Sequence, residues 1–393
     1  HIPGIDEIST RWEVDRCEAL TLATIAEFPG RERMVEAFAL GPCTMQMDTM
    51  RKMVDLCAAC GVDRYVMAIS PFDLRGNYFQ RNWLSVLSVQ SPWFRHYARP
   101  FAEYLAEAAK TARKAQPLGV PWPTDEELWE VAGPSPRHSK ALQQKTSTFR
   151  EEAREAIRAR MAKSSDIPVA HRTPLDTAWT FQPAGLNSLR IDRPSLTVLD
   201  VPATAELSIQ TQLVKGVRIN GTPVDLASAP IDTQFDLSYR RLSVTHLLRV
   251  GENTFVVESD QSEPLKFLPA LILWGGFAVD DKQQLVAPPK TIPLGDWRRH
   301  GYPAFCGVGQ YRATVQWPVA PSQLGLDAGG YPARVLVNGK ECGRRPWGPF
   351  QFNLHGAAHC GTNDIVVEIA STIGHLFTPQ SAPPIGLIDV WTC

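Results

Sequence analysis

The chain has 393 residues, of which 44% are hydrophobic and 21% are charged, an ordinary globular composition. Its formal net charge of −1 gives no electrostatic basis for binding nucleic acid or an anionic membrane. No apolar run reaches the roughly 20 residues of a membrane-spanning helix, and the length suits about two or three domains.

The chain begins with His1 rather than methionine, and no signal peptide is recognisable. We interpret it as a mature product or as a fragment of a longer protein, so localisation signals cannot be read from it. Asp6 and Glu7 follow the turn signal Pro3-Gly4. This carboxylate pair is expected either in a loop at the end of a strand or in a solvated turn.

A strand, a helix and a second strand are predicted next. Residues 34–40 form a short apolar run with a single carboxylate, Glu36, and residues 47–58 carry apolar side chains at helical spacing. Gly61 stands where a helix C-terminus favours a positive φ, and residues 62–69 form the second strand. A unit of this length favours parallel pairing with a right-handed crossover. We therefore expect Glu36 in or just beyond a largely buried strand.

Glu36 needs an explanation in that position, because an ionised carboxylate is costly to bury without a partner. Either it is paired with an arginine or with backbone N–H groups, or it is a catalytic group at the carboxyl end of a barrel strand. We favour the catalytic interpretation, because a polar cluster of Asp73, Arg75 and Asn77 follows the next strand. We predict that these three side chains bind substrate.

A loop with many polar and aromatic residues extends from residue 76 to residue 93. Loops of this length are usually functional or disordered, and the aromatic side chains argue against disorder. Trp83 and Trp93 are predicted to stack against a sugar substrate; the alternative is that these rings pack the loop onto the barrel. Helices are then predicted over about 94–114, which contains a proline, and over about 138–163.

The cysteines and histidines do not form a convincing metal motif. Cys57 and Cys60 make a single CxxC pair inside the predicted helix, where buried small side chains are the favoured interpretation. His355 and His359 are four residues apart, but the sequence between them lacks the glutamate of a metalloprotease helix. We therefore assign no metal ligands.

From Leu175 onward the apolar residues alternate, and turn residues recur about every ten positions, which is typical of β-sandwiches. An internal repeat supports this interpretation. A strand ending in the turn Asn220-Gly221 leads to a G-x-N turn that opens another strand, and Asn338-Gly339 does the same. The two Asn-Gly turns are 118 residues apart, as expected for tandem domains of about 100 residues each.

The second repeat continues to Trp347, Pro349 and Phe350. This segment resembles the jelly-roll, galactose-binding-like domains of glycoside hydrolases, found in family 2 galactosidases and glucuronidases and in the α-L-rhamnosidases of family 106. The N-terminal part resembles the family 106 barrel in residues 35–40, 61–64, 72–76, 91–93 and 119–124. Val35 stands where that family has a serine, which leaves the sugar preference open.

The resemblance implies that Glu36 is the general acid of an inverting, calcium-dependent glycosidase in a periplasmic or secreted location. An inverting reaction needs a second carboxyl group about 6.5–9.5 Å from the first, and Asp6, Glu7 and Asp73 are the candidates within the chain, for this role or for sugar binding. The expected fold is α/β followed by all-β. Its domains are the C-terminal part of a TIM-type barrel over 1–165, with further strands upstream of His1, a β-sandwich over 175–285 and a jelly-roll β-sandwich over 290–393.

The leading function is that of a glycoside hydrolase that cleaves a terminal sugar, such as α-L-rhamnose, from a polysaccharide or glycoside. One alternative is a catalytically inactive carbohydrate-binding protein on the same scaffold. Another is a family 2-like β-galactosidase or β-glucuronidase, although in that family the sandwich precedes the barrel. In each case the expected partner is a carbohydrate, and neither nucleic acid nor a membrane.

Overall fold

The computed structural model describes most of the chain in two compact units. The described residues are 32–38, 43–67, 89–119, 140–161, 172–212, 214–259 and 269–393, together with the backbone of 4–7. The first unit comprises His1–Gly41, Thr49–Ile69 and Arg99–Val169, and the second comprises Pro42–Asp48, Ser70–Ala98 and Ala170–Cys393. Among the described helices, none has the length and apolar character needed to span a membrane.

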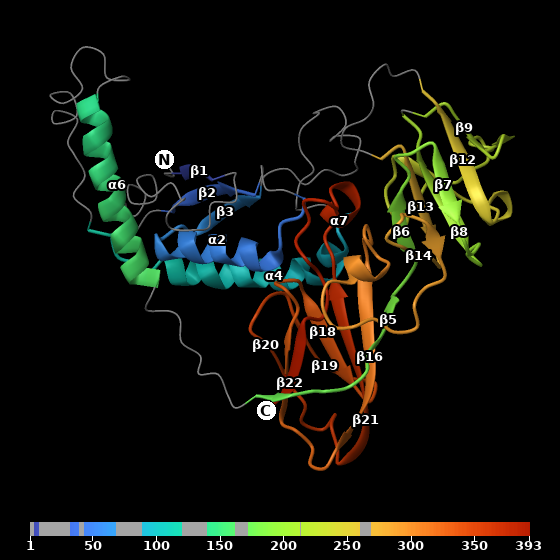
Figure 1. Ribbon diagram of the computed structural model, residues 1–393. Helices are drawn as coiled ribbons and strands as arrows, with labels where there is room; N and C mark the ends of the chain where they lie inside the picture. Colours follow the sequence, from blue (N-terminus) through green and yellow to red (C-terminus); the bar gives the residue numbers. More distant parts are fainter. Residues whose placement is uncertain are drawn as a thin grey trace. The chain divides into compact units, whose positions relative to one another are not determined.

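The first unit contains a parallel sheet in the order β1-β2-β3 (Figure 1). Its strands are β1 Gly4–Glu7, β2 Met34–Ala37 and β3 Arg64–Met67. The helices among the described residues of this half of the chain are α2 Met47–Ala59, α4 Pro92–Ala112 and α6 Lys140–Met161. The predicted strand, helix and strand are therefore present as β2, α2 and β3, and both later helices form, with α4 continuous through Pro100.

Helix α2 is buried through the side chains that the sequence pattern placed on one face. Met50, Val54 and Cys57 are all buried. Gly61 has φ 85°, the left-handed conformation predicted for the residue that ends this helix. The hydroxyl of Tyr65 on β3 donates to the carbonyl of Val54 at 3.2 Å, which ties the strand to the helix.

The prediction that Glu36 is buried is wrong. Along β2, Val35 and Ala37 are buried whereas Glu36 is exposed, and its register partner Val66 on β3 is exposed as well. Successive side chains of a strand point to opposite faces of the sheet, so Val35 and Ala37 lie on a buried face, and Glu36 lies on the other face, which no part of the described chain buries. The charge of Glu36 therefore needs no buried partner.

The TIM-type barrel predicted for residues 1–165 is not confirmed. Within the described part of that range the parallel sheet has three strands, and it does not close on itself. The structure shows a short parallel sheet with helices in this region, followed by β-sandwiches.

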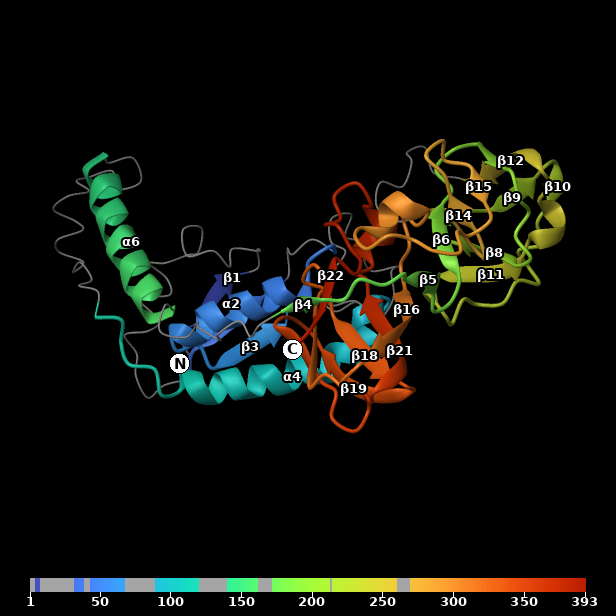
Figure 2. The same ribbon diagram turned by 60° about the horizontal axis from the view of Figure 1, so that its bottom comes forward.

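The second unit contains two β-sandwiches. The first has a six-stranded sheet in the order β10-β9-β12-β7-β15-β14 and a four-stranded sheet in the order β11-β8-β13-β6. Figure 2 labels several of its strands, among them β6, β8, β9 and β12. Its strands are β6 Asn187–Arg190, β7 Ser195–Val198, β8 Ala205–Gln210, β9 Gly216–Ile219, β10 Thr222–Pro223, β11 Tyr239–Ser243, β12 Gly251–Glu258, β13 Leu271–Gly275, β14 Ala278–Val279 and β15 Leu285–Val286. Its core includes Leu207, Ile209, Ile219, Phe255 and Leu273.

The second sandwich has a five-stranded sheet in the order β19-β18-β21-β16-β5 and a four-stranded sheet in the order β20-β17-β22-β4. Its strands are β4 Thr173–Pro174, β5 Thr180–Pro183, β16 Val308–Trp317, β17 Gln323–Asp327, β18 Ala333–Val337, β19 Lys340–Arg345, β20 Phe350–Asn353, β21 Gly361–Ala370 and β22 Asp389–Thr392. A short helix, α7 Gly374–Phe377, follows β21. The core is rich in buried aromatic rings, among them Trp297, Tyr311, Tyr331 and Phe352.

Strands β4 and β5 precede the first sandwich in sequence but belong to the second. The sequence placed residues 180–183 in the first sandwich, whereas β5 pairs with β16 and β4 pairs with β22. The physical reason is Phe181, whose buried ring lies 5.3 Å from that of Trp297 and 5.0 Å from that of Tyr311. The first sandwich is thus inserted between two strands of the second.

The Asn-Gly turns of the internal repeat have the predicted geometry. Asn220 and Gly221 have φ 52° and 82°, and Asn338 and Gly339 have φ 51° and 78°. A two-residue type I′ hairpin turn needs positive φ at both central residues, which asparagine and glycine adopt at least cost. The two β-sandwiches and their repeated turns are therefore confirmed.

Candidate functional sites

The carboxyl edge of the parallel sheet carries Glu36, the predicted catalytic residue. Glu36 is the penultimate residue of β2, which is the central strand, and it is exposed. Open sheets with parallel strands bind ligands outside the carboxyl ends of the strands. The position of Glu36 therefore suits a group that acts on a ligand.

The predicted partners of Glu36 lie on the neighbouring strand. The register pairs Asp6 with Glu36 and Glu7 with Ala37, and only the backbone is described for β1. Neighbouring strands are about 4.8 Å apart, so the backbones of Asp6 and Glu36 lie side by side, but this spacing does not set the distance between their carboxyl groups. The inverting mechanism stays a prediction.

Phe38 fixes the path of the chain immediately after Glu36. It is completely buried, its ring lies 6.1 Å from that of Phe101, and its φ is 72°. Positive φ is rare for a bulky side chain, and such strained residues persist where the surrounding packing holds them, often at functional sites. A buried residue with a strained backbone therefore follows two positions after the candidate catalytic residue.

The opposite, amino-terminal end of the sheet is held by charged groups with a structural role. The backbone N–H of Arg33 donates to Asp63 Oδ1 at 2.7 Å, and Arg113 Nε donates to Asp63 Oδ2 at 3.0 Å. The Arg33 guanidinium is buried and donates to the carbonyl of Ala112 at 3.4 Å. These contacts fix the start of β2 relative to the segment before β3 and to the end of α4.

Of the five predicted substrate-binding residues, Asp73, Arg75, Asn77 and Trp83 lie outside the described residues. Trp93 is described, and the prediction that its ring contacts substrate is wrong. Its side chain is only 1% exposed, and its backbone N–H donates to the carbonyl of Ser371 at 3.3 Å. Trp93 therefore packs inside the second unit.

No metal centre is found in the part of the chain that the structure describes, where no group of three or more His, Cys, Asp or Glu side chains is placed to hold an ion. Cys57 and Cys60 are buried, as favoured from the sequence, and His355 is exposed. The described residues therefore do not fit the calcium site that the sequence resemblance implies, and we assign no step to a metal.

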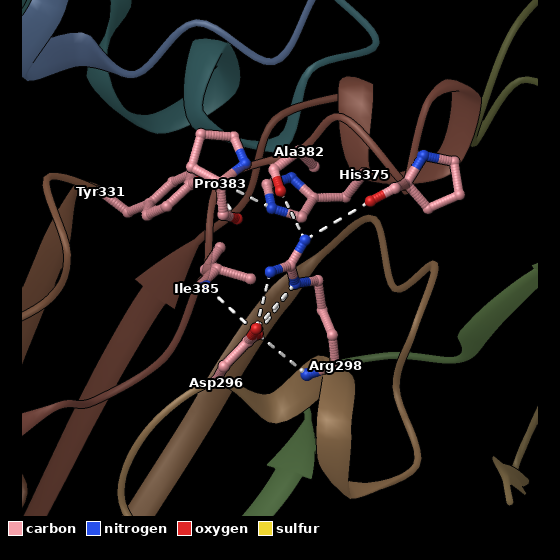
Figure 3. A network of polar contacts seen from close by, with 8 residues as sticks. Asp296, Arg298, Tyr331, His375, Ala382, Pro383 and Ile385 are labelled. Atoms are coloured by element: carbon pink, nitrogen blue, oxygen red, sulfur yellow. Dashed lines mark hydrogen bonds and ion pairs between the residues drawn. The ribbon is translucent and has the colours of Figure 1, made fainter. Parts of the chain in front are cut away.

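A polar network beside a cavity of about 670 Å³ was not foreseen from the sequence (Figure 3). Asp296 accepts hydrogen bonds from Arg298 Nε at 2.9 Å and from the backbone N–H of Ile385 at 3.2 Å. Arg298 also donates to the carbonyls of Pro379 and Ala382. The pair thus holds the segment after α7 against the sandwich. Burial raises the pKa of Asp296, but the bonds from Arg298 and Ile385 outweigh it, and the net pKa is lowered.

His375 lies in the same network and is completely buried. The hydroxyl of Tyr331 donates to the carbonyl of Pro383 at 3.2 Å, so it accepts from His375 Nε2, also at 3.2 Å (Figure 3). The other ring nitrogen faces Thr372 Oγ1 at 3.1 Å. Burial lowers the pKa of His375 to about 4, so the ring is neutral at neutral pH. Both ring nitrogens have protein partners, which makes this network structural rather than catalytic.

A second large cavity, of about 640 Å³, lies against the first sandwich. Its polar walls are already paired within the protein. Arg241 Nε donates to Glu206 at 2.6 Å with its guanidinium over the ring of Trp274, and Arg95 donates to the carbonyl of Gln234 at 2.8 Å. These residues come from segments far apart in sequence, so no local motif could have revealed them.

Comparison with known proteins assigns no family. No family model matches the sequence, and no curated protein matches it. A solved rhamnosidase from Novosphingobium sp. PP1Y has a TM-score of 0.40 and 13% identity, with 100% of this chain and 51% of that chain covered. An α-L-rhamnosidase from Streptomyces avermitilis has a TM-score of 0.20 and 12% identity, over 51% of this chain and 24% of that chain. A β-glucuronidase from Bifidobacterium dentium has a TM-score of 0.18 and 24% identity, over 21% and 15%.

The chain spans about half the length of the Novosphingobium rhamnosidase. Each of these three proteins is named as a glycosidase.

Proposed function

We propose that this chain is part of a glycoside hydrolase that cleaves a terminal sugar, with Glu36 as its general acid. The observation that carries the proposal is the position of Glu36, exposed at the carboxyl edge of a parallel sheet and followed by the strained, buried Phe38. The sequence motifs that resemble family 106 make an α-L-rhamnoside the first substrate to test.

The chemistry needs such a group. Cleavage of a glycosidic bond requires an acid that protonates the leaving oxygen and a second carboxylate that either activates water or attacks the sugar carbon. On the open face of the sheet, the carboxyl group of Glu36 is accessible to a glycosidic oxygen from solvent. A bound sugar would withdraw that face from water, and burial favours the neutral form of a carboxyl group, which is the form that donates a proton.

A second candidate function is carbohydrate binding without catalysis. Two β-sandwiches make up most of the described chain, and they do not depend on Glu36. A family 2-like β-galactosidase or β-glucuronidase has less support, because the parallel sheet precedes both sandwiches here. Whether Glu36 is needed for hydrolysis distinguishes a glycoside hydrolase from a carbohydrate-binding protein without catalysis.

The test is hydrolysis of a panel of aryl glycosides, α-L-rhamnoside included, by the full-length natural protein and its Glu36→Gln variant. Loss of a general acid lowers the rate roughly 10²- to 10⁴-fold. The matched control is Glu32→Gln, which changes an exposed glutamate paired with Arg64 in the same unit and is expected to leave the rate unchanged.

The leaving group gives a second readout. A dinitrophenyl leaving group needs little protonation, so Glu36→Gln should impair its release much less than the release of an alkyl alcohol. An active parent with an unimpaired Glu36→Gln variant would show that Glu36 is structural. A parent that cleaves no glycoside but binds sugars would favour the binding protein.

A further inference from the structure

The outer face of the four-stranded sheet in the second sandwich carries a groove of about 340 Å³. Strand β22 places Val390 in the core, so the next residue, Trp391, points to the opposite, outer face of the sheet. The volume falls at the lower end of the range of about 300–1,000 Å³ for small-molecule sites. The charged side chains in its walls are those of Asp48, Arg172, Asp327 and Asp389, and they lie beside Phe350, Gln351 and Trp391.

The indole of Trp391 lies flat on the sheet because its register partner is a glycine. Gly325 pairs with Trp391 across β17 and β22, and a Cβ atom at residue 325 would overlap the indole ring. On the other side, the guanidinium carbon of Arg172 lies 4.2 Å from the ring centroid. A planar guanidinium held over an aromatic ring keeps its N–H donors in a fixed plane. Trp391 thus supports Arg172 as an oriented donor at the groove.

Two carboxylates face each other in the same groove. Asp327 and Asp389 are register partners on β17 and β22, and directly opposed residues have Cβ atoms about 4.5–5.5 Å apart. Each is oriented by one backbone N–H, because Gly329 donates to Asp327 Oδ1 and Val390 donates to Asp389 Oδ1, both at 2.8 Å. Like charges directly opposite one another destabilise a sheet, so the repulsion within this pair lowers the stability of the fold.

The groove therefore combines oriented acceptors, an oriented donor and apolar ring edges. An anion would meet the three carboxylates of Asp48, Asp327 and Asp389, and an apolar ligand would have to strip water from four charged groups. Among the described residues, no group of three or more His, Cys, Asp or Glu side chains is placed to hold a metal ion. A sugar matches all three features, because its hydroxyl groups both donate and accept hydrogen bonds and its C–H edges are apolar.

We propose that this groove binds a neutral pyranose unit of a carbohydrate, with Asp327 and Asp389 accepting hydrogen bonds from its hydroxyl groups and Arg172 donating to its oxygens. The choice of a sugar rests partly on the proposed glycosidase function, which it deepens by giving the second sandwich a binding role of its own. The groove and Glu36 belong to different units, so each can be tested without the other.

The experiment measures sugar binding to the full-length protein by isothermal titration calorimetry. The background variant is Glu36→Gln, so that the substrate is not consumed. The probes are methyl α-L-rhamnopyranoside, methyl β-D-galactopyranoside and methyl β-D-glucopyranoside. Asp389→Asn keeps the Oδ1 acceptor for the Val390 N–H but removes the charge. Asp389→Asn is expected to weaken sugar binding at the groove at least about 10-fold, because the variant loses charge-assisted hydrogen bonds to the sugar.

Thermal unfolding separates a ligand role from a structural one. Because Asp389→Asn relieves the repulsion from Asp327, the variant should be as stable as the parent or more stable while it binds sugar less well. Gly325→Ala should also abolish binding, because it displaces the Trp391 ring. The matched control is Asp364→Asn, an exposed aspartate on the other sheet of the same sandwich, which should change neither property.

Each outcome bears on one proposal at a time. Binding that is lost in Asp389→Asn and kept in Asp364→Asn supports the groove, even if the parent hydrolyses no glycoside. Hydrolysis of an aryl glycoside combined with identical titrations for both variants overturns the groove and leaves the glycosidase proposal standing. A parent that binds none of the three methyl glycosides overturns the groove as well.

Discussion

The side-chain amide of Asn338 donates to Oδ1 of Asn363 at 2.9 Å, and this bond closes the Asn-Gly hairpin of the second sandwich onto β21. Asn363, completely buried, in turn donates to the carbonyls of His359 and Gly361 at 2.8 and 2.9 Å. The N–H of Asp364 donates back to Asn338 Oδ1 at 2.9 Å. One asparagine thus makes the turn and another anchors it.

The first sandwich has the same arrangement. Asn220 donates to Asn253 Oδ1 at 2.9 Å, and Asn253 donates to the carbonyls of Arg249 and Gly251. The N–H of Thr254 donates to Asn220 Oδ1, also at 2.9 Å. The internal repeat in the sequence therefore encodes a repeated hydrogen-bond network as well as a repeated turn.

Replacement of Asn338 should destabilise the second sandwich in two separable steps. Asn338→Gly removes the side-chain bonds of Asn338 but tolerates φ 51°, and loss of partners for buried groups costs about 1–3 kcal/mol. Asn338→Ala should cost about 1–2 kcal/mol more, because alanine resists the left-handed conformation. Urea unfolding measures both. Equal stability of the two variants would show that the positive φ of residue 338 adds no cost for alanine, which would contradict this prediction.

Gly61→Ala should destabilise the first unit more than Gly221→Ala destabilises the first sandwich. Both positions have positive φ, 85° and 82°, and so share a cost of about 1–2 kcal/mol. At Gly61 the new methyl group would also overlap the buried guanidinium of Arg33, whereas the space around residue 221 is open. Overpacking adds about 1–3 kcal/mol. Equal losses in thermal unfolding would mean that Arg33 moves away freely.

Stability should fall as the pH decreases from 6.5 toward 4 because of His375. Burial lowers its pKa from 6.5 to about 4 in the folded protein, so in this interval the unfolded chain binds a proton that the folded chain does not. The contribution of neutral His375 to the free energy of unfolding is complete above pH 6.5. Near pH 4 the free energy of unfolding is lower by up to about 3 kcal/mol. The pKa of Asp296 is lowered from 3.8, so Asp296 adds to the loss only below that value.

Denaturant unfolding at several pH values checks this prediction. His375→Gln should flatten the slope between pH 4 and 6.5, whatever its effect on stability at neutral pH. His355→Gln, at an exposed histidine, should keep the parent slope. A parent protein whose stability is constant over this interval would contradict the burial of a neutral ring.

Arg298→Ala should destabilise the second sandwich by about 3 kcal/mol, because it leaves the carboxylate of Asp296, only 10% exposed, without its main partner. The neighbouring Arg299 is exposed, and Arg299→Ala should change stability by less than about 0.5 kcal/mol. Arg298→Lys should recover only part of the loss, since lysine cannot hold Asp296 and the carbonyls of Pro379 and Ala382 together. Thermal unfolding of the three variants tests this ranking.

Local patterns in the sequence were sufficient for local structure. The apolar spacing of residues 47–58 and the glycine at Gly61 predicted helix α2 and its end, and the turns at Asn220 and Asn338 predicted the hairpins of both sandwiches. These features depend on backbone preferences and periodicity within one segment. Such information is fully present in the order of the residues.

Burial and long-range pairing were not predictable in the same way. The apolar run around Glu36 suggested a strand covered on both faces, but the structure leaves one face open. Trp93 was predicted to contact substrate because aromatic residues both stack against sugars and pack in protein cores. Only the structure shows that Trp93 is buried. The groove at Trp391 depends on a cross-strand glycine at Gly325 and on Arg172 from before the first sandwich, which no local pattern connects.

The insertion of the first sandwich between β5 and β16 has a consequence for synthesis on the ribosome. The partners of β5 and β4 are made about 130 and about 220 residues after them. At about 5–20 residues per second, β4 waits about 10 to 40 seconds for β22 while the inserted sandwich is completed. Unpaired strand edges are templates for aggregation, so β4 and β5 are exposed to this hazard throughout the interval.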